Sequence, residues 1–189
     1  MEQQTGAPTW AAVVLAGGTG ARLGGVDKAS IEYDGRTLLA RALDALVDAD
    51  EVVVVGEQVP TERPVTFTLE DPRHGGPVAG LLTGRDALLL RPTLLAVLAV
   101  DMPHVDTGTF RRLREAVGDA DGARLVDGTG RHPLALVLRL DRLDAVRPGL
   151  EEQHGMAVHR LLAPLDLAVV PTRGREHHDV DGWDDLTDG

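Results

Sequence analysis

The sequence of 189 residues contains no cysteine, which excludes disulfide bonds, thiolate zinc sites, iron–sulfur clusters and cysteine nucleophiles. Aromatic residues are also scarce, with two Trp, two Phe and one Tyr, so few side chains are available to stack on nucleic-acid bases. No apolar run approaches the ~20 residues that a membrane-spanning helix needs, and residues 1–5 lack the basic and then apolar order of a signal peptide. We therefore expect a soluble, cytoplasmic protein.

Positive charge is scarce as well. The chain has 19 Lys and Arg against 30 Asp and Glu, which gives a formal net charge of −11. This charge repels nucleic-acid backbones and anionic membranes, so we expect neither as a partner. Hydrophobic residues at 43% and charged residues at 26% are typical of globular proteins. We expect residues 1–189 to form one domain, with 1–9 as a flexible tail, and the sequence does not indicate an oligomeric state.

Short apolar runs predict strands, and apolar residues at a 3.6-residue period predict helices between them. The predicted strands cover residues 11–16, 52–55, 65–69, 93–100 and 167–170. The predicted helices cover 38–46 after a Thr37 cap, 77–88, 107–117, 142–146 and 157–162, with a turn of helix after residue 181. Residues 123–126 and 133–140 flank a turn at 127–130 and predict a hairpin.

Strands that alternate with helices predict parallel crossover connections. The fold class is therefore α/β, a three-layer α/β/α sandwich with a Rossmann-like, mostly parallel sheet, to which the late hairpin adds antiparallel pairing. In such sheets ligands bind in the crevice beyond the carboxyl ends of the strands. Residues in the loops that follow the predicted strands are therefore the first candidates for a functional site.

A glycine-rich loop follows the first predicted strand. Five of the nine residues 17–25 are Gly, and the loop contains Arg22 and ends at Lys28, the only lysine in the chain. Backbone N–H groups in such a loop can turn toward an anion, and the two cations add charged donors, so the loop predicts a phosphate site. It is not a P-loop, because Lys28 precedes Ala29 rather than Ser or Thr.

A nicotinamide-dependent oxidoreductase is the alternative that this loop leaves open. Gly18, Gly20 and Gly24 fit the spacing of a dinucleotide-binding loop loosely. The acidic residue expected about 20 residues further on, at the end of the second strand, is absent. Thr37 lies four residues after Tyr33, so the Tyr-x-x-x-Lys pair of short-chain dehydrogenases is absent too. Both absences argue against hydride transfer.

Acidic residues follow two later strands. Asp101 comes directly after the strongest central strand, where a carboxylate can bind a hard cation such as Mg²⁺ and bridge it to phosphates. Asp179 and Asp181 come after the last strand and would point the same way in an extended segment. Asp181 either contacts magnesium as a second ligand or orients the substrate, or it caps the last helix, and the sequence does not decide between these roles.

The segment LAGGTGARLGGVDKA, residues 15–29, resembles the N-terminal signature of the molybdenum cofactor guanylyltransferases, within the nucleotidyltransferases that include sugar-phosphate pyrophosphorylases. The segment Gly76–Gly80 resembles the Gly-Pro-Leu-Ala-Gly motif that lies against guanine in that family, with an acidic residue, here Asp71, upstream. Asp101-Met102-Pro103 resembles the family's magnesium-binding Asp-x-Pro. Gly20 stands where the family usually has Ser, one residue is added between Gly24 and Asp27, and Gly182-Trp183 replaces Thr-Pro.

The resemblance implies the role of each matched residue. It implies catalytic roles for Arg22, Lys28 and Asp101, and magnesium at Asp101, while Asp181 remains a candidate for a second ligand from its position alone. It implies nucleotide binding by Leu15, Ala16, Gly17, Gly18, Thr19, Gly20, Arg22, Lys28, Asp71, Gly76, Pro77, Gly80 and Asp101. Arg131, His132, Asp179 and Asp181 would lie near the acceptor substrate, although a polar hairpin edge explains Arg131 and His132 equally well.

The resemblance also implies a reaction. The protein would transfer GMP from Mg-GTP to molybdopterin or the molybdenum cofactor and release pyrophosphate. CMP transfer to the same acceptor and nucleotidyl transfer to a sugar phosphate are the alternatives within the class. A non-catalytic nucleotide-binding protein is the alternative outside it.

Overall fold

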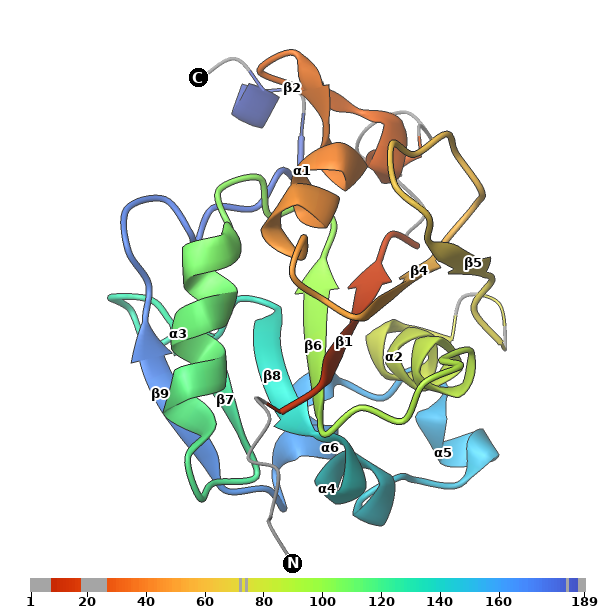
Figure 1. Cartoon of the computed structure of the whole chain (residues 1–189), viewed down its shortest axis with the longest axis vertical. Coiled ribbons are helices and arrows are strands. Elements are labelled where there is room, and N and C mark those ends of the chain that lie inside the picture. The colour runs from red at the N-terminus through yellow and green to blue at the C-terminus, as the bar shows by residue number, and fades with distance from the viewer. Residues whose placement is uncertain (1–7, 18–26, 72, 74, 183, 187–189) are drawn as a thin grey trace, which may run out of the picture.

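A computed structural model describes residues 8–17, 27–71, 73, 75–182 and 184–186 of the chain. A seven-stranded sheet in the order β5-β4-β1-β6-β8-β7-β9 lies at its centre (Figure 1). The strands are β1 (Trp10–Leu15), β4 (Glu51–Val55), β5 (Thr66–Thr68), β6 (Leu94–Ala99), β7 (Gly122–Val126), β8 (Ala135–Arg139) and β9 (Leu167–Pro171). Strand β8 runs antiparallel to the other six strands, which are parallel to one another.

Helices cover both faces of this sheet. The helices α1 (Leu38–Ala45) and α3 (Thr107–Val117) pack on one face, and α2 (Pro77–Asp86), α4 (Leu140–Ala145) and α6 (Val158–Leu162) pack on the other. The central strand β1 is buried on both sides, because Ala12 and Val14 face the first group of helices while Ala11 and Val13 face the second. The predicted three-layer sandwich with a late antiparallel hairpin is confirmed.

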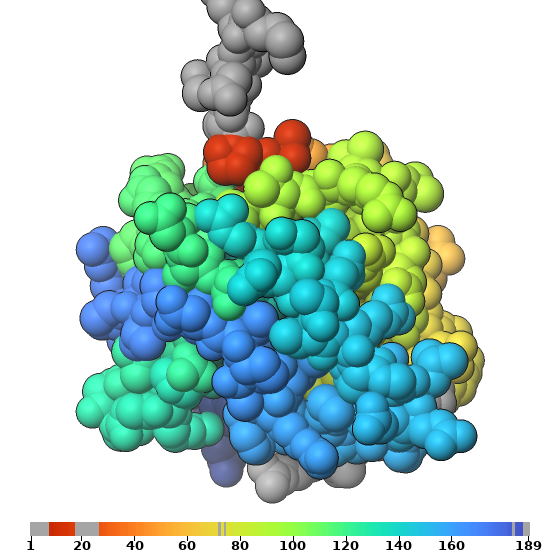
Figure 2. Space-filling model, turned by 90° about the horizontal axis from the view of Figure 1, so that it is seen from below, coloured from red at the N-terminus to blue at the C-terminus, as the bar shows by residue number. Residues whose placement is uncertain are grey.

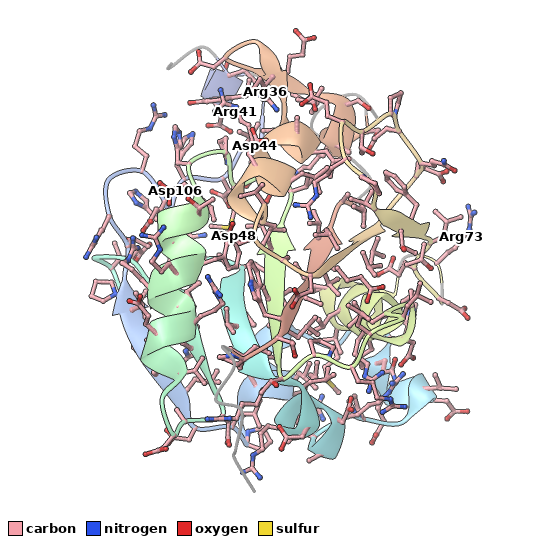
Figure 3. All side chains as sticks on the ribbon, in the orientation of Figure 1. Arg36, Arg41, Asp44, Asp48, Arg73 and Asp106 are labelled. Carbon is pink, nitrogen blue, oxygen red and sulfur yellow. The ribbon has the colours of Figure 1, made fainter. Side chains whose placement is uncertain are left out.

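Local signals set where the helices begin. The Thr37 hydroxyl accepts a hydrogen bond from the Ala40 N–H at 3.1 Å and caps α1, as its position predicts. Asp106, labelled at the start of α3 in Figure 3, accepts one from the Thr109 N–H at 2.9 Å. Pro77 is the first residue of α2, where its missing N–H costs nothing.

Four short elements were not predicted from the sequence, because two to four residues show no period. They are η2 (Lys28–Ser30), β2 (Glu32–Tyr33), β3 (Arg36–Thr37) and α5 (Leu150–Gln153). Asp34 and Gly35 connect β2 to β3 with φ values of 53° and 72°, as a tight hairpin turn requires. The turn of helix predicted after Asp181 is η3 (Asp184–Leu186).

Ion pairs join helices at the end of the sheet where β1 and β6 begin. Arg85 on α2 forms a hydrogen bond of 2.7 Å from Nε to Asp144 on α4, and Arg147 forms one of 2.6 Å to Asp86. Figure 2 shows this end, where α4 lies beside the segment that joins α2 to β6. Among the described residues, no helix has the length and apolar character needed to cross a membrane.

Helix α2 packs tightly against the sheet at Gly84. A Cβ atom at this position would lie 2.5 Å from Val13 Cγ1 and 2.9 Å from Val55 Cγ2. Gly84→Ala is therefore expected to destabilise the protein by about 1–3 kcal/mol through overpacking, which outweighs the gain in helix propensity of about 1 kcal/mol. Urea denaturation measures the change, with Gly128→Ala as the control because a Cβ atom there would meet no atom within 4 Å apart from its chain neighbours. Equal unfolding midpoints for the two variants would contradict this close packing.

Candidate active site

A cleft of about 550 Å³ opens where β1, β4 and β6 end. Ala16 and Gly17 follow β1, Gly56 follows β4 and Asp101 lies two residues after β6, and all four line the cleft. The first residues of α2 form part of its wall. The cleft thus lies at the carboxyl ends of parallel strands, where the fold predicts a ligand.

Glycines keep the cleft open. Gly17, Gly56, Gly76 and Gly80 all line it. A Cβ atom at Gly80 would lie 3.3 Å from Leu15 Cδ2, and one at Gly56 would lie 3.0 Å from the Cβ of Ala16. Gly76 also has a φ of 92°, which L side chains rarely adopt. Side chains at these positions would fill the space that a planar base could occupy.

Lys28 lies at the beginning of η2, directly after the glycine-rich loop. The carboxylate of Asp27 accepts hydrogen bonds from the Ala29 N–H and the Ser30 hydroxyl and so holds this turn. The Lys28 ammonium donates to Asp101 Oδ2 at 2.8 Å and to the Val180 carbonyl at 3.3 Å. Its Nζ also lies 3.5 Å from Asp181 Oδ1.

The charge of Lys28 is stabilised by these neighbours. Partial burial lowers the pKa of Lys28, but the hydrogen bond and the attraction of Asp101, together with the attraction of Asp181, raise the pKa above its usual 10.5. The ammonium therefore stays charged at neutral pH. It neutralises part of the negative charge of Asp101 and Asp181, which come from two distant parts of the chain.

The segment after β9 is tied to the site by its backbone. The Val180 N–H donates to the Asp101 carbonyl at 2.8 Å, and the Val180 side chain is fully buried. Upstream, the buried Glu176 carboxylate accepts hydrogen bonds from Thr109 at 2.6 Å and from Arg112 at 2.8 Å, both on α3. A buried charge held by several donors fixes its segment, and here that segment carries Asp179 and Asp181.

A second pocket of about 240 Å³ adjoins the cleft and shares Ala99, Asp101 and Leu134 with it. Arg131, His132 and Asp179 contribute to its walls. The His132 Nδ1 atom lies 2.8 Å from the Leu125 carbonyl, which can only accept, so Nδ1 carries the proton and donates. Asp101 is thus the charged residue among the three that line both the cleft and the second pocket.

The structure brings most of the residues singled out in the sequence together. Leu15, Ala16, Gly17, Gly76, Pro77, Gly80 and Asp101 line the cleft, and Lys28 binds Asp101. The predicted residues Gly18, Thr19, Gly20 and Arg22 lie outside the described part of the chain.

Asp71 is not among the residues that line the cleft. Its exposed side chain follows Glu70, which does line the cleft. Glu57, Glu70 and Arg73 are cleft residues that the sequence analysis did not single out, and Arg73 projects from the loop between β5 and α2 (Figure 3). These three residues follow β4 and β5, and this position after a strand is the sequence feature that could have indicated them.

The Asp181 side chain lies beside Lys28. Its Oδ1 atom lies 3.5 Å from Lys28 Nζ, and its backbone N–H donates to Asp185 Oδ2 at 2.9 Å. Hydrogen bonds from the backbone N–H groups of Asp181 and Gly182 lower the pKa of Asp185.

The donor atoms around Lys28 suit a hard divalent cation. Asp101 and Asp181 offer carboxylate oxygens, and Mg²⁺ in proteins is held by one or two carboxylates together with waters and substrate phosphates. Within the ranges that the structure describes, no group of three His, Cys, Asp or Glu side chains could hold a metal by itself. Protein ligands for such an ion would therefore need to be completed by a bound phosphate.

Comparison with solved structures identifies the fold. The fold matches a 2-C-methyl-D-erythritol 4-phosphate cytidylyltransferase from Thermus thermophilus with a TM-score of 0.72 at 20% identity, covering 92% of this chain and 94% of that one. It also matches a molybdopterin-guanine dinucleotide biosynthesis protein A from Archaeoglobus fulgidus with a TM-score of 0.69 at 19% identity, covering 93% and 94%. The fold is that of nucleotidyltransferases.

Comparison of sequences gives the family. Residues 12–171 match the MobA-like NTP transferase domain, and the chain belongs to this family of nucleotidyltransferases. A probable molybdenum cofactor guanylyltransferase from Opitutus terrae is 32% identical over 181 residues, which cover 92% of this chain and 89% of the relative. The resemblance stated from the sequence motifs and the expectation of a nucleotidyltransferase are both confirmed.

Proposed function

We propose that this protein transfers GMP from GTP to the terminal phosphate of molybdopterin or the molybdenum cofactor and releases pyrophosphate. The observation that carries the proposal is the place of Asp101 between two adjoining pockets. A group transfer needs a donor and an acceptor held on either side of the reacting atom. The name of the relative from Opitutus terrae supports guanylyl transfer as the reaction.

The larger cleft takes GTP in this proposal, with the base between the glycines and the phosphates toward Lys28. The smaller pocket takes the acceptor, where Arg131 and His132 can face its anionic phosphate. An acceptor oxygen attacks the α-phosphorus, and the bond from that phosphorus to the bridging oxygen of the β-phosphate breaks. Pyrophosphate leaves with the electron pair. The attacking oxygen is already an anion, so the reaction needs no strong base.

Charge neutralisation and alignment are the contributions of the protein. Asp101, with Asp181 as a second ligand, would hold a Mg²⁺ ion that acts as a Lewis acid on the α-phosphate. Lys28 and Arg22 would balance the charge on the departing pyrophosphate. An acidic protein needs such a local group of cations to bring two polyanions together.

Thermal-shift measurements with each nucleoside triphosphate and Mg²⁺ test the base assignment. We expect GTP to raise the melting temperature well above the shift given by CTP, ATP or UTP, because a ligand that binds only the native state stabilises it in proportion to the logarithm of its affinity. The same series with EDTA is the control for the metal. A shift with CTP that equals or exceeds the shift with GTP would favour cytidylyl transfer instead.

A further inference from the structure

Three aromatic side chains from distant parts of the chain lie next to one another. They are Tyr33 on β2, His104 in the loop after β6 and His178 in the segment after β9. The rings of Tyr33 and His104 meet edge to face with centroids 5.5 Å apart, and those of His104 and His178 are 5.7 Å apart. None of the three is among the residues that line the two pockets. We call this group the ring cluster.

Each member of the ring cluster is close in sequence to a charged residue of the site. The members lie five residues after Lys28, three residues after Asp101 and three residues before Asp181, respectively. The segments of Asp101 and Asp181 are also joined by the backbone, through the hydrogen bond from the Val180 N–H to the Asp101 carbonyl. The segment of Lys28 has to be joined to them in another way.

Two side-chain hydrogen bonds connect the segment from η2 to β3 with the loop that follows β6, both of which are described throughout. One joins Lys28 to Asp101 at 2.8 Å, and the other joins the Tyr33 hydroxyl to His104 Nε2 at 3.2 Å. In the proposed reaction Lys28 meets the leaving pyrophosphate and Asp101 meets a metal ion, so the first bond is exchanged when nucleotide binds. The second bond uses neither charged group and can persist.

The two partners of the second bond are themselves held in place. Tyr33 is buried, and its carbonyl accepts a hydrogen bond of 2.9 Å from Nε of Arg41 on α1, which is labelled in Figure 3. The guanidinium carbon of Arg41 lies 5.2 Å from the centroid of the Tyr33 ring. Burial, and then the positive charges nearby, lower the pKa of His104, so its ring adds no charge to the cluster at neutral pH.

We propose that Tyr33 and His104 are positioning residues for nucleotidyl transfer, and that the hydrogen bond between them holds Lys28 in place relative to Asp101 while nucleotide and metal occupy the site. This inference rests on the proposed function, because it concerns the state in which Lys28 meets the leaving pyrophosphate. Alignment of charged groups with the reacting phosphates acts mainly on the transition state. Loss of the bond is therefore expected to lower kcat and to leave KM for GTP nearly unchanged.

Steady-state kinetics of pyrophosphate release with the acceptor test the assignment. Tyr33→Phe keeps the buried ring and removes only the hydroxyl, and it is expected to lower kcat about tenfold with KM for GTP within about twofold of the wild type. His104→Leu should give a similar loss, and the double variant should lose little more, because each substitution removes the same bond. His104→Gln, whose amide can still bond to the hydroxyl, should restore kcat to within about threefold of the wild type.

Thr61→Val is the matched control. It removes a hydroxyl hydrogen bond of 2.9 Å to the Arg63 carbonyl, and Thr61 lines neither pocket, so kcat should stay at the wild-type value. Thermal melting of every variant shows that the assays are made on folded protein. Nuclear magnetic resonance of the histidine nitrogens gives a readout besides activity. The Nε2 signal of His104 should differ between the wild type and Tyr33→Phe both with and without Mg-GTP.

The outcomes separate this inference from the function on which it rests. Wild-type kcat in Tyr33→Phe, or an Nε2 signal that this substitution alters only in the absence of nucleotide, would overturn the inference. Equal losses of kcat in His104→Gln and His104→Leu, or an equal loss in Thr61→Val, would show a general structural effect and overturn it too. A wild type that transfers CMP rather than GMP would overturn the guanylyl proposal alone, because the same ratios of kcat are then measured with CTP.

Discussion

Asp101→Asn is expected to reduce nucleotidyl transfer by at least about 100-fold, because the amide removes a charged ligand for the metal at the boundary of the two pockets. The carboxylate has two functions in this structure. It accepts the hydrogen bond from Lys28 at 2.8 Å, and it faces both the nucleotide cleft and the second pocket. Asparagine has nearly the same shape, so the fold should remain intact.

The measurement is pyrophosphate release from GTP in the presence of the acceptor, at saturating and at limiting Mg²⁺. Asp181→Asn is the matched comparison, since its carboxylate is 53% exposed and lies 3.5 Å from Lys28, whereas that of Asp101 is 21% exposed and lies 2.8 Å away. A smaller loss is therefore expected for Asp181→Asn. Binding of Mn²⁺ to the GTP complex, followed by electron paramagnetic resonance, should weaken in Asp101→Asn. Wild-type turnover in Asp101→Asn would exclude the metal role.

The layered fold follows from local features of the sequence. Strands β1 and β6 are apolar throughout and β4 is apolar after Glu51, because both faces of these strands are buried, and such runs are visible without a structure. The β2–β3 hairpin is two residues on each side, so the only sign of it is the turn at Asp34 and Gly35. Its pairing depends on the packing of Tyr33 in the core, which the sequence does not reveal.

The site was predictable to the extent that topology determines it. Lys28 and Asp101 are 73 residues apart, yet both follow strands whose carboxyl ends meet at one edge of the sheet. Topology does not determine the direction in which a single side chain points. The sequence offers Glu70 and Asp71 side by side, and which of them faces the cleft depends on the residue at which β5 ends and on the contact with Thr83. These are tertiary features.

Substitution of Lys28 separates its expected role in stabilising pyrophosphate from its effect on metal binding by Asp101 and Asp181. The ammonium lies among Asp101 Oδ2, Asp181 Oδ1 and the Val180 carbonyl, at the place where the two carboxylates would hold a divalent cation. Lys28→Gln is therefore expected to lower nucleotidyl transfer by about 100-fold or more, because the leaving pyrophosphate loses a cationic partner. In the nucleotide-free protein the same variant should bind Mn²⁺ about tenfold more tightly, since a competing positive charge is removed from the carboxylates.

Lys28→Arg is the control, because it keeps the charge and should keep Mn²⁺ binding weak in the nucleotide-free protein. The ion pair between Lys28 and Asp101 depends on pH in a defined direction. Because the pKa of Lys28 is raised above its usual 10.5, the ion pair with Asp101 persists through neutral pH and is lost only as the pH rises through that pKa. The wild type should therefore bind Mn²⁺ weakly without nucleotide across the neutral range. If Lys28→Gln binds Mn²⁺ no more tightly than the wild type does, the ammonium and the metal do not compete for the same carboxylates.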